Sequence, residues 1–377
     1  MIDNTQRRVA IANSAQSLLS PRHSNRQHVD LISEAVAGAL LGTGVRIDDI
    51  DFVIDSGSDF LDGRSISNCG FLGAMGAHHK EESRVEEDGL WALGYAADKI
   101  AGGSASIGLV IAYSKPSESS IDNFWTGLLD PFVQRPVGLD HRSAAGLTAR
   151  QYLAAAELQA ADLRAVSERS WLGAARNPRV EADSPPDDDA FWRDPVATPL
   201  SASDLARPVD GAVAVLVTSA DVADTVSEAP VWLTGHGSAI DQHFLASREQ
   251  TALPAARAAA QSALRMSGGT RAGDYDLVEL SASSTVGELM VLEALGFAEQ
   301  YRGIELYRSP GAASINPSGG ALPADPIMAT GLVRAHEAAS RLAQKPGFLE
   351  GKARRAMVHG AGGFAMQNHC VFTMEVD

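Results

Sequence analysis

The sequence contains few cysteines: Cys69 and Cys370 are the only two among its 377 residues. Two cysteines build no disulfide framework and offer no metal-ligand spacing, which is typical of a reducing cytoplasm. Long hydrophobic runs are also missing, since none approaches the roughly 18 residues of a membrane helix. The polar start, residues 1–8, lacks the apolar core of a signal peptide. We therefore expect a cytoplasmic protein with no bound metal and no membrane segment.

Positive charge is scarce as well. The chain has 31 Lys and Arg against 47 Asp and Glu, a formal net charge of −16. This disfavours nucleic acid as a ligand, because no basic excess neutralises its phosphates, but it leaves room for a local basic patch that holds a smaller anion. Hydrophobic residues make up 45% and charged residues 21%. These values indicate a globular chain with a large core, in two domains or one large domain.

Strand and helix patterns alternate in the first half of the chain. Residues 8–12, 51–55 and 107–113 are short β-branched or apolar runs that predict strands. Apolar residues recur at helical spacing in residues 30–41 and 88–100, which predict helices. Such alternation implies a largely parallel sheet with helices on both faces.

The second half repeats this order. Residues 230–234, 276–280 and 355–360 resemble the three strands of the first half, a helix is expected at 329–342, and a last strand at 370–375. A repeated unit of well over a hundred residues predicts an internal duplication. The sequence thus divides into an N-terminal half, residues 1–114 plus 206–227, an inserted loop domain, residues 115–205, and a C-terminal half, residues 228–377. The loop domain is where substrate contacts are expected.

Several segments carry recognisable motifs. They are residues 85–104 with the strand after them, residues 196–217 with Asp-Gly-Ala at 210–212, residues 274–297, and residues 316–331 followed by the glycine loop 358–363. Asn-Pro-Ser-Gly-Gly at 316–320 is the most specific of these motifs. In order and spacing the segments resemble the thiolase superfamily, closest to its SCP2-like branch.

This resemblance implies the α/β thiolase fold, in which two βαβαβαββ halves form a five-layered αβαβα sandwich, usually dimeric. It also implies coenzyme A thioesters as substrates, with no covalently bound cofactor. Lys115 and Arg142 are then candidates for the coenzyme A phosphates, unless they are ordinary solvated side chains. The other expected ligand contacts are His141 in the loop domain and the glycines Gly319, Gly320 and Gly362.

The sequence departs from the family at its four catalytic positions. The nucleophilic cysteine, three residues before the helix-opening Gly89, is replaced by Glu86, and the His-Asp-x-Phe turn is Ser-Ala-Ser-Ser at 281–284. The histidine of the Gly-His-Pro motif becomes Asp325, and the second cysteine becomes His359. Ordinary thiolysis needs a thiolate to carry the acyl group and a base to activate it, so these changes exclude it.

Four residues remain as candidates for chemistry. His359 is a general base or acid, or else a hydrogen-bonded core histidine. Asp325 acts as an acid or base if burial raises its pKa, or else caps the following helix. Asn316 orients a water or a carbonyl group, or else forms a turn. Glu86 lines the pocket, or else belongs with its acidic neighbours to a capped first turn.

Three functions follow from these departures. The first is an enzyme that forms or cleaves a C–C bond in acyl-CoA esters without a cysteine nucleophile, as an acyltransferase or a retro-aldol lyase. Backbone N–H groups at the Gly89 helix would then hold the oxyanion. The alternative is a non-catalytic thiolase-like subunit that scaffolds a catalytic thiolase or a zinc-ribbon/OB-fold partner. In a third, Glu86 mimics an acylated cysteine in a decarboxylating or acyl-CoA-binding protein.

The state of the pocket distinguishes the first two functions. An open pocket beside Glu86 and His359 favours an enzyme, whereas a pocket filled by Trp91 or Phe364 favours a scaffold. The partners expected are acyl-CoA and either a second copy of the chain, a thiolase paralogue or a zinc-ribbon/OB-fold protein.

Overall fold

The computed structural model describes residues 7–182, 186–309, 314–348 and 353–377. Its main sheet has ten strands in the order β10-β9-β11-β12-β8-β1-β7-β4-β2-β3. The strands are β1 (Val9–Gln16), β2 (Phe52–Ser56), β3 (Glu81–Val85), β4 (Ile107–Ser114), β7 (Gly211–Ser219), β8 (Val231–Ile240), β9 (Leu277–Leu280), β10 (Ser314–Ile315), β11 (Arg355–Gly362) and β12 (Asn368–Glu375).

The two halves of this sheet have the same pairing pattern. In the N-terminal half β2 runs parallel to β3 and β4, and β7 lies antiparallel between β4 and β1. In the C-terminal half β9 runs parallel to β10 and β11, and β12 lies antiparallel between β11 and β8. The halves meet where β1 pairs antiparallel with β8. The predicted duplication is confirmed, but the prediction of a largely parallel sheet is wrong, because β1, β7, β8 and β12 are antiparallel.

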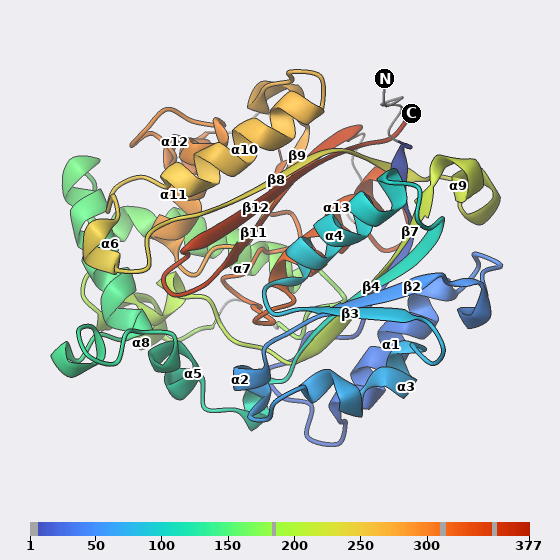
Figure 1. Ribbon diagram of the computed structural model, residues 1–377. Coiled ribbons are helices and arrows are strands. Elements are labelled where there is room, and N and C mark those ends of the chain that lie inside the picture. Colours follow the sequence, from blue (N-terminus) through green and yellow to red (C-terminus); the bar gives the residue numbers. More distant parts are fainter. Residues whose placement is uncertain (1–6, 183–185, 310–313, 349–352) are drawn as a thin grey trace.

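Helices form three layers around the two halves of the sheet (Figure 1). One outer face is covered by α1 (His28–Leu40) and α3 (Leu72–Met75), and the other by α10 (Pro254–Met266) and α11 (Thr285–Leu295). Between the halves lie α4 (Gly89–Ala101) and α13 (Thr330–Leu342), whose apolar side chains join strands of both halves in one core. This arrangement is the five-layered αβαβα sandwich expected from the resemblance.

The two central helices approach each other closely at their first turns. A Cβ atom on Gly89 would lie 2.7 Å from the Cβ of Leu332 and 2.8 Å from that of Ala112. Glycine is therefore needed where α4 begins, since any side chain would push it from α13 and β4. As a result, the N-termini of α4 and α13 lie next to each other in the centre of the molecule.

Segment 115–205 consists mainly of helices. They are α5 (Ile121–Gly127), α6 (His141–Ala155), α7 (Arg164–Ala175) and α8 (Asp189–Arg193), and a small hairpin of β5 (Pro195–Ala197) and β6 (Leu200–Ser201) follows. The remaining helices are α2 (Asp59–Asp62), α9 (Ala220–Val226) and α12 (Glu305–Arg308). Side chains of α6 and α7 share a core with α11, so this segment covers one end of the C-terminal half. None of the helices described is long and apolar enough to cross a membrane.

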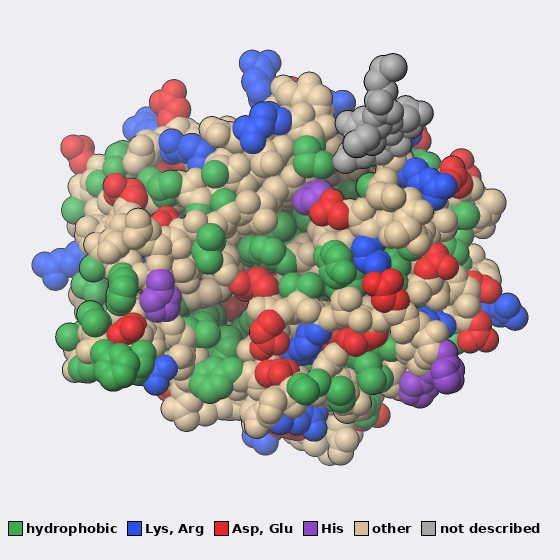
Figure 2. All heavy atoms as spheres, viewed as in Figure 1, with side chains coloured by type: hydrophobic (Ala, Val, Ile, Leu, Met, Phe, Trp, Pro, Cys, Tyr) green, Lys and Arg blue, Asp and Glu red, His purple; other side chains and the backbone are tan. Residues whose placement is uncertain are grey.

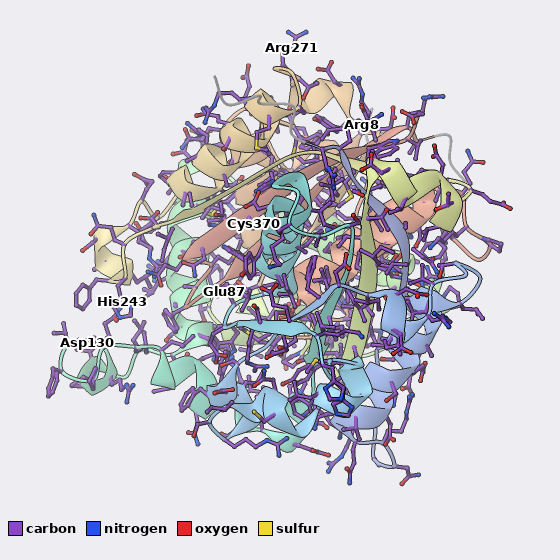
Figure 3. The ribbon with its side chains drawn as sticks, turned by 45° about the vertical axis from the view of Figure 1, so that its right-hand side comes forward. Arg8, Glu87, Asp130, His243, Arg271 and Cys370 are labelled. Atoms are coloured by element: carbon purple, nitrogen blue, oxygen red, sulfur yellow. The ribbon has the colours of Figure 1, made fainter. Side chains whose placement is uncertain are left out.

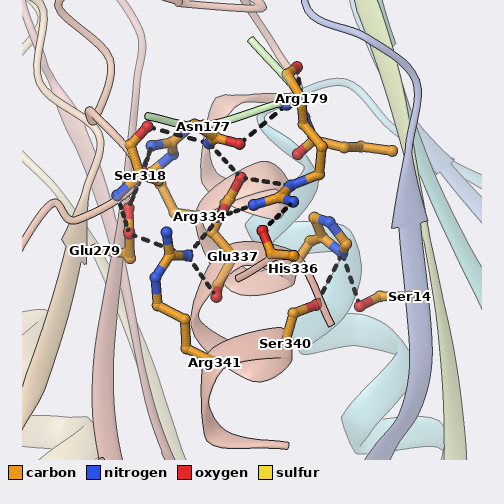
Figure 4. Close-up of polar contacts among 12 residues, drawn as sticks. Ser14, Asn177, Arg179, Glu279, Ser318, Arg334, His336, Glu337, Ser340 and Arg341 are labelled. Carbon is orange, nitrogen blue, oxygen red and sulfur yellow. Dashed lines mark hydrogen bonds and ion pairs between the residues drawn. The ribbon is translucent and has the colours of Figure 1, made fainter. Parts of the chain in front are cut away.

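A buried network of charged side chains fixes α13 to its surroundings (Figure 4). Glu337 has no exposed surface and accepts hydrogen bonds from Asn177, Arg179 and Arg341. A second carboxylate, Glu279 on β9, is paired with Arg334 at 3.2 Å. The network connects α13, β9 and the chain after α7, and so holds the helix whose first turn enters the site described next.

Candidate active site

A cavity of about 920 Å³ lies where segment 115–205 meets the starts of α4, α11 and α13. Figure 2 shows a hollow on this face, bordered by hydrophobic and acidic side chains. Its lining includes the aromatic side chains of Phe60, Phe124, Trp125, Trp171 and Phe191 and the carboxyl groups of Glu86, Glu87, Asp88 and Asp325. In Figure 3 Glu87 lies inside the molecule, whereas Asp130 and His243, on two loops beside the cavity, lie at one edge.

Asp88 caps two helices with one carboxylate. Its Oδ1 accepts from the N–H of Leu90 in α4, and its Oδ2 from the N–H of Gly331 in α13, both at 2.9 Å. A Cβ on Gly331 would lie 2.2 Å from Oδ1, so that position needs glycine. Burial raises the pKa of Asp88 to about 7. This carboxylate occupies the place between the helix starts where an anion is favoured.

The first donors of α4 are therefore taken. The N–H of Gly89 donates to the carbonyl oxygen of Met328 at 2.8 Å, and that of Trp91 to the carbonyl of Asp88 at 3.0 Å. The N–H of Leu90 donates to the side chain of Asp88. The backbone N–H groups of residues 89–91 therefore all have hydrogen-bond acceptors within the protein. The expectation that this helix start supplies the oxyanion site is wrong, because the protein's own oxygen atoms satisfy it.

Asp325 is held from both sides and presents an oxygen to the cavity. Its N–H donates to the carbonyl of Arg207 at 2.8 Å, and its carbonyl accepts from the N–H of Val209 at 3.1 Å. The hydroxyl of Thr330 donates to Oδ1 at 2.5 Å, whereas Oδ2 has no donor among the described residues. Burial raises the pKa of Asp325 to about 6. This side chain bonds a hydroxyl of α13 rather than its backbone, so it combines fixed geometry with a basic oxygen.

Glu86 and Glu87 point in different directions. Glu86 accepts from the N–H of Asp59 at 2.5 Å and pairs with Nε of Arg84 at 3.2 Å, which holds its half-exposed carboxylate at the edge of the cavity. Glu87 accepts a hydrogen bond from Asn368, and burial raises its pKa. A Cβ on Gly362 would lie 1.9 Å from Glu87, so this glycine makes room for the acid.

Substitution of Glu86 tests whether it has a chemical role. We expect Glu86→Gln to change kcat/KM of any acyl-CoA reaction by less than about fivefold, because a half-exposed ion pair contributes about 0–1 kcal/mol. Steady-state kinetics of the purified variant measure this. A loss of several hundredfold would show that Glu86 takes part in the chemistry.

The structure does not bring His359 or Asn316 to the cavity. His359 lies within β11, which continues two residues beyond the predicted strand, and has no exposed surface. Its Nε2 is 2.9 Å from Nδ1 of His369, and burial holds its pKa well below the usual range. The Oδ1 of Asn316 accepts from the N–H of Leu280 at 2.7 Å. His359 is therefore a hydrogen-bonded core histidine and Asn316 a turn residue, the second of the two roles considered for each in the sequence.

Of the residues predicted to contact the ligand, some line the cavity and others lie outside it. His141, Arg142 and Gly362 line the cavity, and burial lowers the pKa of His141. Lys115 is buried outside it, in ion pairs with Glu118 and Asp210. Gly319 and Gly320 have positive φ angles of 105° and 69° and also lie outside the lining. These two glycines thus shape the backbone of their turn.

Other lining residues gave no signal in the sequence. Arg248 lines the cavity but belongs to no motif, whereas Arg207 and Ser281 line it from two of the motif segments without having been singled out there. Ser281 is 5% exposed, and within the described residues its hydroxyl has no hydrogen-bond partner. The described part of the chain has no group of three or more His, Cys, Asp and Glu side chains placed to hold one metal ion.

The cavity is open. Phe364 is buried beside Leu129 and Leu245, and Trp91 packs against the central core; neither lines the cavity. Of the two cysteines, Cys370 is buried and Cys69 is exposed. Neither residue lines the cavity. The criterion stated above, an open pocket beside Glu86 and His359, is thus met at Glu86 but not at His359, and the absence of Trp91 and Phe364 from the lining favours an enzyme over a filled scaffold.

Known proteins with similar sequences are thiolases and a lyase. The family described as Thiolase C-terminal domain-like matches residues 237–374. An acetyl-CoA acetyltransferase of Methanothermobacter thermautotrophicus is 28% identical over 362 residues, covering 89% of this chain and 91% of that protein. A 17-hydroxy-3-oxo-4-pregnene-20-carboxyl-CoA lyase of Mycobacterium tuberculosis is 27% identical over 305 residues, covering 73% of this chain and 75% of that protein.

Solved structures agree with the fold. A chain of the Ltp2-ChsH2(DUF35) aldolase superposes with a TM-score of 0.83 at 21% identity, covering 98% of both chains. A monomeric SCP2-thiolase like protein type 1 from Mycobacterium smegmatis gives a TM-score of 0.72 at 19% identity, covering 100% of this chain and 78% of that one. At these identities the likeness establishes the architecture.

Proposed function

We propose that this chain, which has the thiolase fold, resembles the SCP2-like branch of the thiolase superfamily and has a carboxylate in place of the family's histidine, is a retro-aldol lyase of β-hydroxyacyl-CoA esters. The observation that carries the proposal is Asp325. It lines an open cavity, only one of its carboxylate oxygens has a hydrogen-bond donor among the described residues, and burial raises its pKa to about 6. A lyase and an aldolase among the similar proteins support C–C bond chemistry.

The reaction needs one base and no covalent intermediate. The Asp325 carboxylate takes the proton of the β-hydroxyl group, the O–H electrons form a carbonyl group, and the bond between Cα and Cβ breaks. The electron pair of that bond passes into the thioester as an enolate. The protonated Asp325 then returns the proton to Cα. The products are a ketone or aldehyde and a shortened acyl-CoA, with no free coenzyme A consumed.

The thioester oxygen needs a donor while the enolate exists. Ser281, between β9 and α11, lines the same cavity, and its hydroxyl has no hydrogen-bond partner in the part of the chain that the structure describes. We assign it this role in place of the occupied start of α4. Arg142 and Arg207 line the cavity and supply positive charge for the coenzyme A phosphates, and the aromatic walls suit a bulky apolar acyl group.

A cleavage assay with the isolated chain tests this function. β-Hydroxyacyl-CoA esters of increasing bulk are incubated with the protein, and the carbonyl product and the shortened acyl-CoA are separated by chromatography and quantified. The proposal requires both products in equal amounts. Failure to cleave any member of the series, although the esters bind, would reject it.

The rate should fall on the acid side of neutrality. Because Asp325 acts as its carboxylate and its pKa is about 6, we expect log kcat/KM to decrease by about one per pH unit below that value. Above it the carboxylate is ionised and this dependence disappears. Measuring kcat/KM over a series of pH values shows this decrease on the acid side. A kcat/KM that stays constant down to the ordinary aspartate pKa near 4 would contradict the assignment.

The occupied start of α4 favours a second candidate, a non-catalytic thiolase-like subunit. Asp88 fills the place between the helix starts, as a protein that had given up acyl transfer would allow. Such a subunit would pair with a second copy, a thiolase paralogue or a zinc-ribbon/OB-fold protein. Cleavage that occurs only in a mixture with such a partner, and that survives Asp325→Asn, would support this candidate over the lyase.

A further inference from the structure

Arg248 joins two loops at one wall of the cavity. Its Nε donates to the carbonyl of Gln242 at 2.6 Å and Nη2 to that of His243 at 3.0 Å. On the other side Nη1 donates to the carbonyls of Phe364 and Ala365 at 2.9 and 3.1 Å. One guanidinium group thus binds four carbonyl oxygens, two on each loop. The planar fork of arginine provides this geometry, whereas the compact ammonium of lysine does not.

The loop after β11 needs such support because its backbone is strained. Ala365 and Met366 have φ angles of 51° and 55°, in the left-handed region that residues with side chains avoid. Two such residues in succession cost energy that the surroundings must offset. The Arg248 hydrogen bonds go to the carbonyl groups of Phe364 and Ala365, directly at this strained point.

This loop places atoms beside the proposed reaction centre. Gly362 makes room for Glu87, and the sulfur of Met366 would lie 2.8 Å from a Cβ on Gly287, at the start of α11. All four residues line the cavity. A shift of the loop would therefore move Glu87 and alter the space between the loop and α11, where Ser281 lies.

The charge of Arg248 is buried without an ion pair. The residue is 9% exposed, and no carboxylate within the described ranges forms a salt bridge with it. Burial lowers its pKa, and Asp241 only partly opposes this effect. Burying an unpaired cation is unfavourable, so an arginine used merely to fill space would be a poor choice here. Its geometry must contribute something that an apolar side chain would not.

We propose that Arg248 is a positioning residue that fixes the loop of residues 361–366 against residues 241–247 and thereby sets the catalytic geometry of the cavity. Its effect on turnover rests on the proposed lyase function, but its effect on the loops does not. The role is indirect, since its guanidinium donors bind loop carbonyls rather than the reacting atoms.

The test compares Arg248→Ala and Arg248→Lys with Arg257→Ala, an exposed arginine on α10. Amide hydrogen exchange is followed by mass spectrometry with and without millimolar guanidinium chloride. We expect faster exchange in Arg248→Ala confined to residues 241–247 and 361–367, and its reversal by guanidinium. Exchange in Arg257→Ala should match the wild type. Unchanged exchange at these loops, or an increase across the whole chain, would overturn the proposal.

Kinetics provide the second arm. We expect kcat of Arg248→Ala to fall by about 10²-fold with little change in KM, because a small displacement of positioned groups costs about that much. Guanidinium should restore kcat, and Arg248→Lys should remain slow. Full activity in Arg248→Lys would overturn the proposal. If the wild type cleaves no ester, the lyase function fails, while the exchange experiment still decides the role of Arg248.

Discussion

Replacing Asp325 with asparagine should lower kcat/KM for cleavage of a β-hydroxyacyl-CoA by about 10²–10⁴-fold, the usual contribution of a positioned general base. Asparagine has nearly the same shape and keeps an oxygen for the Thr330 hydroxyl, which donates to Asp325 at 2.5 Å. The backbone bonds to Arg207 and Val209 are unaffected. The variant therefore loses the basic oxygen while the cavity keeps its form. Steady-state kinetics at pH 7.5, well above the pKa of Asp325, would show the loss in kcat.

Asp189→Asn is the matched control, because Asp189 is exposed and, among the described residues, forms an ion pair only with Arg193, at 3.8 Å on α8. Its activity should equal that of the wild type. Thermal unfolding of both variants shows whether the fold is retained. An Asp325→Asn protein that is folded and cleaves within a few fold of the wild type would remove Asp325 from the mechanism.

Glu337→Gln should be the most destabilising of the conservative substitutions considered. The carboxylate accepts from Asn177 at 2.8 Å and is shared by the guanidinium groups of Arg179 and Arg341, with no exposed surface. Removing its charge leaves Arg179 without a carboxylate partner among the described residues and leaves Arg341 with Glu279 alone, at 3.8 Å, which costs about 3–5 kcal/mol. Urea unfolding followed by tryptophan fluorescence measures the change. Glu299→Gln, at an exposed turn, is the control.

The acid dependence of this network has a definite sign. The guanidinium groups of Arg341 and Arg179 outweigh burial and lower the pKa of Glu337 to about 2, below the unfolded value near 4.3. A lowered pKa stabilises the folded state above the unfolded pKa, and this contribution is lost as the pH falls through about 2. The difference in stability between wild type and Glu337→Gln should therefore shrink on acidification. An unchanged difference would show that the network does not depend on this charge.

Much of the fold was predictable because its signals are local. The strand at residues 107–113 and the helix at 329–342 match β4 and α13 within one residue, since a buried strand is continuously apolar and a central helix repeats small and apolar residues. The strand β3 was missed, because its residues, Glu81 to Val85, are mostly polar at a sheet edge. Helix α11 was expected only from the resemblance of residues 274–297 to the family, because it is buried on all sides and shows no apolar stripe.

The site was predicted less well than the fold. Glu86 and Asp325 were found from their places in the motifs, and both line the cavity. His359 was favoured because histidine titrates near neutral pH, but sequence alone did not show that β11 continues past it and that His369 on β12 faces it. The carboxylate of Asp88 accepts a hydrogen bond from the N–H of Gly331, and the guanidinium of Arg248 donates one to the carbonyl of Phe364. Such long-range backbone contacts leave no pattern in the sequence.

The central claim is that this thiolase fold cleaves a C–C bond with a carboxylate base and without an acyl-cysteine. Incubation of the isolated protein with a β-hydroxyacyl-CoA in D₂O, without free coenzyme A, tests it most directly. The account predicts a carbonyl product and a shortened acyl-CoA in equal amounts, with one deuterium at the α-carbon of the latter, because the proton that Asp325 returns comes from an exchangeable hydroxyl. Cleavage that requires added coenzyme A, or an acyl group found on a cysteine, would contradict it.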